Sequence, residues 1–222
     1  MQPPWMAAQP VDHPFEARRE VEFGSPANFP DMPVVLVDQP LSSDRKLVVI
    51  GIDTDAGLSA SSPNRFLARG SFVRQLQQAE DLLDDDREKQ LRVLMLHHSR
   101  MHRDQLVCGI DKKSRTVLEQ FIRRHRISVL LTGHVHVCDS EVETVHHKNS
   151  KWWLYESRCG TTTQRSSAPL GCPDMNLQPN SFLVHRIYEA ADQSLNWYSE
   201  EFLRGPWAPF SSARIKRITI LP

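Results

Sequence analysis

Three short apolar runs, each followed by polar residues, constrain the fold of this chain more than any other feature. They are Lys46–Asp53 (KLVVIGID), Arg92–Leu96 (RVLML) and Ile127–Leu131 (ISVLL). Continuous apolar runs rich in β-branched residues are typical of strands buried on both faces. Segments with helical periodicity separate the runs. The order strand, helix, strand, helix, strand predicts an α/β fold with a mostly parallel sheet and functional groups at the carboxyl ends of the strands.

The two intervening segments are expected to be amphipathic helices. In the first, apolar residues recur at helical spacing across residues 71–89. The second begins near Asp111 or Ser114, either of which can cap a helix, and ends near Arg126.

Beyond residue 136 the segments become shorter, with alternating or aromatic composition, which is typical of antiparallel strands. The expected strands are Glu141–Val145, Trp152–Ser157, Ser181–Tyr188 and Ser194–Trp197.

The two ends of the chain differ from this central region. Eight prolines lie within the first forty residues, and each removes a backbone donor. Residues 1–43 are therefore expected to be a connecting segment, in which Val34–Asp38 has the composition of a short strand. Residues 44–205 are expected to form the domain. Residues 206–222, with three basic residues after position 213, are expected to be a solvated tail.

Charge and hydropathy exclude several kinds of partner. Lys and Arg total 27 and Asp and Glu total 27, so no net basic field attracts phosphate backbones, and specific nucleic-acid binding is not expected. No apolar run approaches the roughly 18–20 residues of a membrane-spanning helix, and the first ten residues lack the features of a secretory signal. The sequence therefore predicts a cytoplasmic protein without a membrane partner.

Histidines follow two of the predicted strands directly. His97 and His98 come after Arg92–Leu96, and His134 and His136 come after Ile127–Leu131. Imidazoles at neighbouring strand ends suit a divalent transition metal. Because two residues at i and i+2 in extended backbone point to opposite sides, the chain is expected to turn there, with Gly133 supplying the freedom.

The strand and histidine motifs resemble those of a known family. LMLHHS (Leu94–Ser99) and LLTGHVH (Leu130–His136), with a helix between them, are similar to the last two motifs of the calcineurin-like metallophosphoesterases. The likeness is greatest to the branch that includes cyclic-nucleotide phosphodiesterases. The segments VVIGIDTDAG (Val48–Gly57) and CGTTT (Cys159–Thr163) fall where that branch has similar features. The resemblance covers about residues 44–200.

This resemblance implies a metal-dependent phosphoric ester hydrolase that acts on a phosphoester substrate with Mn, Fe or Zn. It also implies the C-terminal half of an αββα sandwich. By position, His97 corresponds to the metal ligand of the fourth motif, and His134 and His136 correspond to the two ligands of the fifth. His98 is the alternative ligand if the register differs by one residue.

The chain departs from the family at its upstream motifs. The sequence contains no Asp-x-His, Gly-Asp-x-x-Asp or Gly-Asn-His-Asp/Glu motif in front of these strands, so it lacks the carboxylates that bridge two metal ions and offers no assignable catalytic residue. We expect a truncated or partial form that binds at most one ion. Half of a sandwich would also leave one apolar sheet face exposed, unless a second copy or a missing N-terminal half covers it.

Two alternatives compete with a hydrolase. Loss of ligands is also what a non-catalytic pseudo-phosphoesterase interaction module would show. A structural zinc module could combine His134, His136 and Cys138 with either Cys159 or Cys172, although this spacing is not that of zinc-finger knuckles.

Overall fold

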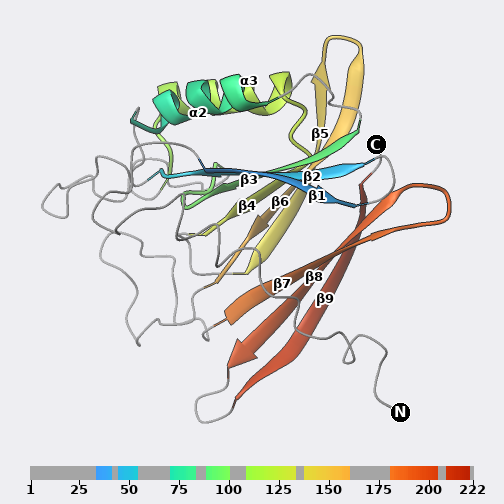
Figure 1. Ribbon diagram of the computed structural model, residues 1–222. Coiled ribbons are helices and arrows are strands. Elements are labelled where there is room, and N and C mark those ends of the chain that lie inside the picture. The colour runs from blue at the N-terminus through green and yellow to red at the C-terminus, as the bar shows by residue number, and fades with distance from the viewer. Residues whose placement is uncertain are drawn as a thin grey trace, which may run out of the picture. The chain divides into compact units, whose positions relative to one another are not determined.

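The computed structural model describes residues 34–41, 45–54, 71–83, 89–100, 109–133, 138–160, 181–204 and 209–220. All of them lie within one compact unit, Pro33–Pro222. They form two sheets and two helices (Figure 1). In chain order the elements are β1 (Val34–Pro40), β2 (Lys46–Ile52), α2 (Ser71–Leu82), β3 (Gln90–Leu96), α3 (Lys112–Arg124), β4 (Val129–Thr132), β5 (Asp139–His147), β6 (Ser150–Arg158), β7 (Ser181–Glu189), β8 (Leu195–Arg204) and β9 (Phe210–Ile220).

The first sheet has the strand order β1-β2-β3-β4-β6-β5. Its four central strands, β2, β3, β4 and β6, are parallel, and the edge strands β1 and β5 are antiparallel to their neighbours. The predicted α/β fold, with a parallel strand-helix unit followed by antiparallel strands, is confirmed. Because the central strands are parallel, their carboxyl ends meet at one edge of the sheet.

Helices α2 and α3 lie side by side on one face of this sheet (Figure 1). Their apolar stripes, which include Phe72, Leu76, Leu118 and Phe121, pack in one buried cluster with residues of β2, β3 and β4. Asp111 caps α3, since its carboxylate accepts hydrogen bonds from the next helical N–H groups. Both predicted helices are present, and α2 ends at Leu82, earlier than expected.

The second sheet, β7-β8-β9, packs on the opposite face of the first. Trp197 and Ile218 share a buried cluster with Val93 and Val129. The hydroxyl groups of Tyr155 and Ser199 also form a hydrogen bond of 2.9 Å between the sheets. The expectation that one face of the first sheet would lie uncovered is therefore wrong, because the chain's own last three strands supply the second layer.

Strand β9 replaces the expected solvated tail. It pairs with β8 along its length, and two of its basic side chains reach the first sheet. Arg214 donates a hydrogen bond to the carbonyl oxygen of Cys138 at 3.0 Å, and Lys216 donates one to the hydroxyl oxygen of Ser140 at 2.6 Å. The basic residues that indicated a solvated tail instead lie on a strand. Their side chains donate hydrogen bonds to carbonyl and hydroxyl oxygens.

The sheet also begins earlier than the expected domain boundary at residue 44. Strand β1 pairs with β2 in antiparallel register, Val34 opposite Gly51. Residues 1–33 lie outside the described part of the chain. Among described residues, Tyr188 and Ile215 on the second sheet are exposed large apolar side chains, at 54% and 63%.

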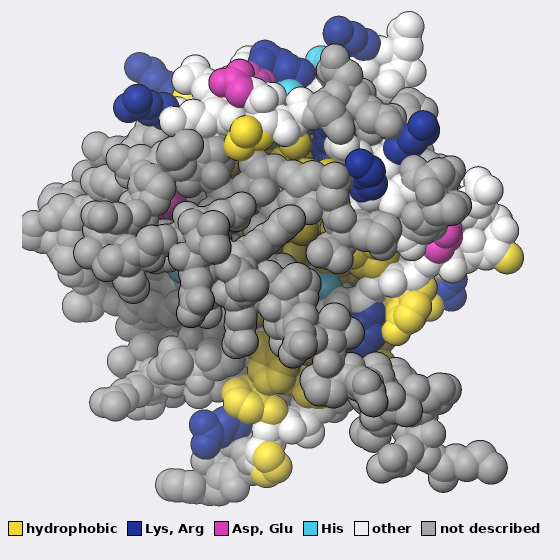
Figure 2. Space-filling model, viewed as in Figure 1, with side chains coloured by type: hydrophobic (Ala, Val, Ile, Leu, Met, Phe, Trp, Pro, Cys, Tyr) yellow, Lys and Arg dark blue, Asp and Glu magenta, His cyan; other side chains and the backbone are white. Residues whose placement is uncertain are grey.

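Neither described helix is long and apolar enough to cross a membrane. Figure 2 shows the described Lys and Arg side chains dispersed over the viewed face rather than gathered in one patch.

Candidate functional site

Strands β3 and β4 end beside each other. Their parallel register places Met95 opposite Leu131, and pairing continues past the strands, because the backbone N–H of Gly133 donates to the carbonyl oxygen of His97 at 2.9 Å. Gly133 therefore lies against His97, and the next residue in the chain is His134. His134 and His136 themselves lie outside the described residues.

The side chain of His97 is exposed at this edge. A Cβ atom added to Gly133 would lie 3.6 Å from Nδ1 of His97, which is an ordinary contact distance, and the φ angle of Gly133 is not in the left-handed region. At Gly133 itself, therefore, no left-handed backbone requires glycine, whereas the expected turn between His134 and His136 lies outside the described residues. The place of His97 and Gly133 follows from strand pairing.

His98 has a different environment from His97. It is fully buried, its Nδ1 lies 2.8 Å from the hydroxyl oxygen of Thr54, and its backbone N–H donates to the same oxygen at 3.2 Å. The two imidazole rings are nearly perpendicular, with centroids 5.1 Å apart. His98 thus joins the end of β3 to Thr54, which follows β2. Because His98 is buried in this contact and His97 is exposed, His97 is the favoured candidate ligand.

Helix α2 holds the end of β2 in turn. The side-chain oxygen of Gln75 accepts a hydrogen bond from the backbone N–H of Asp53 at 2.9 Å, and its amide donates to the carbonyl oxygen of Asp53 at 3.1 Å. Gln75 is fully buried. These paired hydrogen bonds fix the backbone of Asp53. They thereby position the next residue, Thr54, whose hydroxyl group contacts His98.

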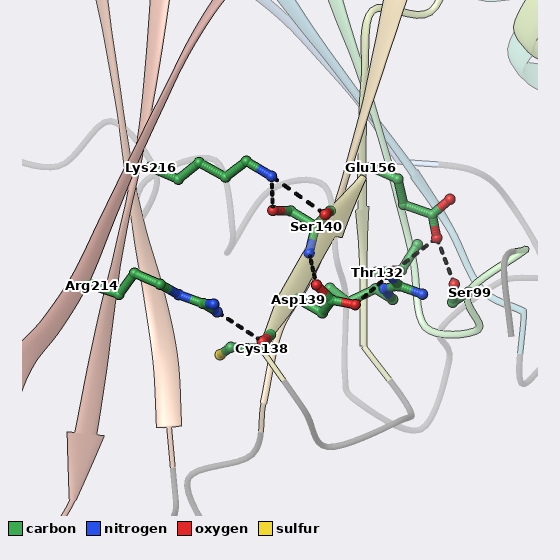
Figure 3. Close-up of polar contacts among 9 residues, drawn as sticks. Ser99, Thr132, Cys138, Asp139, Ser140, Glu156, Arg214 and Lys216 are labelled. Carbon is green, nitrogen blue, oxygen red and sulfur yellow. Dashed lines mark hydrogen bonds and ion pairs between the residues drawn. The ribbon is translucent and has the colours of Figure 1, made fainter. Parts of the chain in front are cut away.

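A buried carboxylate lies on β6 below the same edge. Ser99 donates a hydrogen bond of 2.5 Å to Oε1 of Glu156, and Thr132 donates a longer one of 3.5 Å to the same oxygen (Figure 3). The guanidinium of Arg100 forms an ion pair of 3.2 Å with Oε2 and a second of 2.5 Å with Glu143. Glu156 thereby connects residues that follow β3 and end β4.

Burial raises the pKa of Glu156, while the hydrogen bond from Ser99 and the charges of Arg100 and Arg158 act in the opposite direction. Oε1 of Glu156 accepts the hydrogen bond from Ser99, and Oε2 is buried in an ion pair with Nε of Arg100 that lacks hydrogen-bond geometry. Among the described residues, Glu156 belongs to no group of three or more His, Cys, Asp or Glu side chains that could hold a metal ion. Sequence analysis missed this residue. The available signal was a glutamate within the apolar run Trp152–Ser157, on a strand expected to be buried.

The described residues do not by themselves form a metal site. Among them, no group of three or more His, Cys, Asp or Glu side chains could hold a metal ion. Of the three predicted ligands, His97 is the one that lies among the described residues. It lies beside Gly133, which precedes His134 and His136 in the chain. The ligand set His97, His134 and His136 therefore stays a prediction.

Sequence comparisons assign no family to this chain. No family model matches the sequence, and no curated protein matches it.

Several solved structures are distantly similar in fold. GAP50, the anchor in the inner membrane complex of Plasmodium, is 12% identical with a TM-score of 0.45; the match covers 86% of this chain and 54% of GAP50. A Staphylococcus aureus protein described as a 5′-nucleotidase, solved with alpha-ketoglutarate, is 13% identical with a TM-score of 0.36, and the match covers 85% of this chain and 29% of that one.

Vps29 from Entamoeba histolytica, solved in complex with Zn²⁺, is 14% identical with a TM-score of 0.27, and the match covers 77% of this chain and 98% of Vps29. This chain spans about half the length of GAP50 and less than a third of the Staphylococcus protein. At these scores the similarities carry no assignment of activity.

Proposed function

We propose that this chain is a partial metal-dependent phosphoric ester hydrolase of the calcineurin-like type, with His97, His134 and His136 as its metal ligands. The observation that supports this proposal is the hydrogen bond from the Gly133 N–H to the His97 carbonyl oxygen. Since β3 and β4 are parallel, the chain leaves both strands at one edge of the sheet. His134 is the residue that follows Gly133 in the chain.

Three neutral imidazoles are a donor set that suits Zn or Fe better than Mn, which prefers oxygen ligands, and with zinc they leave a fourth position open. A divalent ion there would supply Lewis-acid polarisation of a phosphoryl oxygen or a bound water. The chain itself would contribute positioning. The contacts of Thr54 with His98 and of Ser99 with Glu156 fix the two residues that follow His97.

The missing carboxylates limit the activity that this proposal allows. Without the three upstream motifs a second metal ion would have almost no ligands, and loss of even outer partners commonly costs about 10- to 100-fold in affinity or activity. We therefore expect one weakly bound ion and hydrolysis near background, while a longer form that carries the upstream motifs would be active.

A non-catalytic interaction module is the second candidate. Its support is that the carboxylate of Glu156, buried near the strand ends, is engaged with Ser99 and Arg100. The described residues thus offer no evident substitute for the lost ligands. The same fold would then serve as a binding surface.

An assay of phosphodiester hydrolysis tests the proposal. The purified chain, with and without Mn²⁺, is incubated with bis(p-nitrophenyl) phosphate beside the double variant His134→Ala, His136→Ala. His146→Ala is the matched control, because His146 is an exposed histidine on β5. We expect turnover near background in all three proteins. Robust turnover that the double variant abolishes would show that three histidines suffice and that the ligand-count argument is wrong.

Metal binding separates the two candidates. Equilibrium dialysis with Mn²⁺ or Zn²⁺ should give one ion per chain, lost in His97→Ala and retained in His146→Ala. A chain that binds no ion at all would contradict the hydrolase proposal and leave the interaction module.

A further inference from the structure

Two cysteines face each other across β5 and β6. The antiparallel register places Asp139 opposite Arg158, so the preceding residue, Cys138, lies opposite the following residue, Cys159. The hairpin of β5 and β6 has a two-residue turn, so its closing pair, His147 and Ser150, is hydrogen-bonded. Hydrogen-bonded and non-hydrogen-bonded pairs alternate from there. The pair Cys138 and Cys159 falls at a non-hydrogen-bonded position. Side chains at such positions approach most closely across an antiparallel pair.

The backbone around the pair agrees with this position. The N–H of Cys159 donates to the carbonyl oxygen of Thr132 on β4 at 2.7 Å, away from Cys138. The N–H of Gly160 donates to the sulfur of Cys138 at 3.2 Å. Both cysteines are free thiols in this structure.

The surroundings hold Cys138 in place. The Cys138 sulfur lies 3.3 Å from the hydroxyl oxygen of Ser181 on β7, and Arg214 donates to the Cys138 carbonyl oxygen from β9 (Figure 3). A Cβ atom on Gly160 would lie 1.8 Å from the Ser181 hydroxyl oxygen. Glycine at 160 therefore permits the close approach of β6 to β7 that encloses the pair.

The two thiols differ in access. Cys138 is buried and Cys159 is partly exposed. The contact with Cys138 lowers the pKa of Cys159 to about 6. The thiolate is the reactive form of cysteine, so Cys159 is the thiol that meets a reagent first.

We propose that Cys138 and Cys159 are a redox-active dithiol that forms a reversible disulfide between the ends of β5 and β6. The oxidant is a small-molecule disulfide such as oxidised glutathione. The Cys159 thiolate attacks one of its sulfurs and releases one thiolate. The Cys138 sulfur then attacks the sulfur of Cys159 in the mixed disulfide and releases the second thiol. The protein loses two electrons and two protons, and the reagent is reduced to two thiols.

The pair is placed to affect the candidate metal site. Cys138 follows His136 by two residues, so a disulfide would tether the end of the segment that carries two predicted ligands to β6. This coupling rests on the proposed function, whereas the disulfide itself does not.

A glutathione titration of the purified chain tests the proposal. The chain is equilibrated in buffers of rising oxidised-to-reduced glutathione ratio, free thiols are blocked by alkylation, and linked peptides are identified by mass spectrometry. We expect a Cys138–Cys159 linkage that accumulates with oxidised glutathione and disappears on return to reduced glutathione. The variant Cys108→Ser, Cys172→Ser should titrate in the same way, since it keeps the pair.

Two further variants make the result decisive. Cys138→Ser should stop at a mixed glutathione disulfide on Cys159, because the resolving thiol is absent. The variant His134→Ala, His136→Ala should still form the linkage, which separates this proposal from the metal site. The proposal is overturned if both cysteines remain open to alkylation in buffers that modify Cys159 of Cys138→Ser, or if the main linkage involves Cys108 or Cys172.

Discussion

The backbone N–H of Gly133 donates to the carbonyl oxygen of His97 over 2.9 Å, which extends the pairing of β3 and β4 beyond the last residue of each strand. As a result, Gly133, which precedes the two histidines of the second motif, lies beside His97 at the edge of the sheet. The candidate metal site depends on this pairing, and the buried contacts of His98 and Glu156 support its backbone.

Gly160→Ala should destabilise the chain. The new Cβ would meet the hydroxyl oxygen of Ser181 at 1.8 Å and its Cβ at 3.1 Å, and such overpacking costs about 1–3 kcal/mol. Gly133→Ala is the matched control, because its Cβ would make only ordinary contacts. Urea unfolding of the three proteins measures the difference. Equal stability of the two variants would contradict the close packing of β6 against β7.

Glu156→Gln should lower the free energy of unfolding by about 3 kcal/mol, the lower end of the cost of breaking a buried ion pair. The change removes one of two carboxylates from Arg100, which is buried at 8% exposure, and a buried charge that loses a partner is costly. Glu143→Gln removes the other carboxylate, whose side chain is 38% exposed, and exposed ion pairs contribute at most about 1 kcal/mol. A larger loss in Glu143→Gln than in Glu156→Gln would count against this description of the cluster.

The stability of the second sheet should fall in acid. Burial lowers the pKa of His185 to about 4, and its Nδ1 accepts a hydrogen bond from the indole N–H of Trp197 at 3.1 Å, which requires the unprotonated nitrogen. The unfolded chain binds a proton near the ordinary histidine pKa of about 6.5. The contribution of His185 is therefore complete above that value and is lost as the pH falls toward about 4.

Unfolding free energies of the chain and of His185→Gln, measured across this pH range, check the expectation. The wild-type value should decrease more than that of the variant, by an amount on the order of 3 kcal/mol. Parallel pH profiles for the two proteins would assign the acid sensitivity to other groups.

The parallel strands of the core were predictable because nearly all of their residues are apolar. The strands at Lys46, Arg92 and Ile127 are continuous apolar runs, and in the structure they, with the helices between them, provide the buried cluster beneath α2 and α3. Hydrophobic burial dominates in such segments, so the continuous apolar runs were enough to locate them.

Strand β9 and Glu156 were missed for the opposite reason. Along β9, Arg214 and Lys216 point to oxygens of the first sheet, and such contacts between distant segments leave no periodic trace in the sequence. Glu156 is stabilised by Ser99 and Arg100, which lie more than fifty residues earlier in the chain. The histidine motif located the strand edge, but its supporting contacts could be found only in the structure.

The most direct test of the account is the binding of Co²⁺ to the purified chain, followed by its visible absorption spectrum. We predict one ion per chain with the intense bands of a four-coordinate site, lost in each of His97→Ala, His134→Ala and His136→Ala and kept in His146→Ala. Binding that survives His97→Ala, or a chain that takes up no ion, would contradict the claim that these three histidines form one metal site.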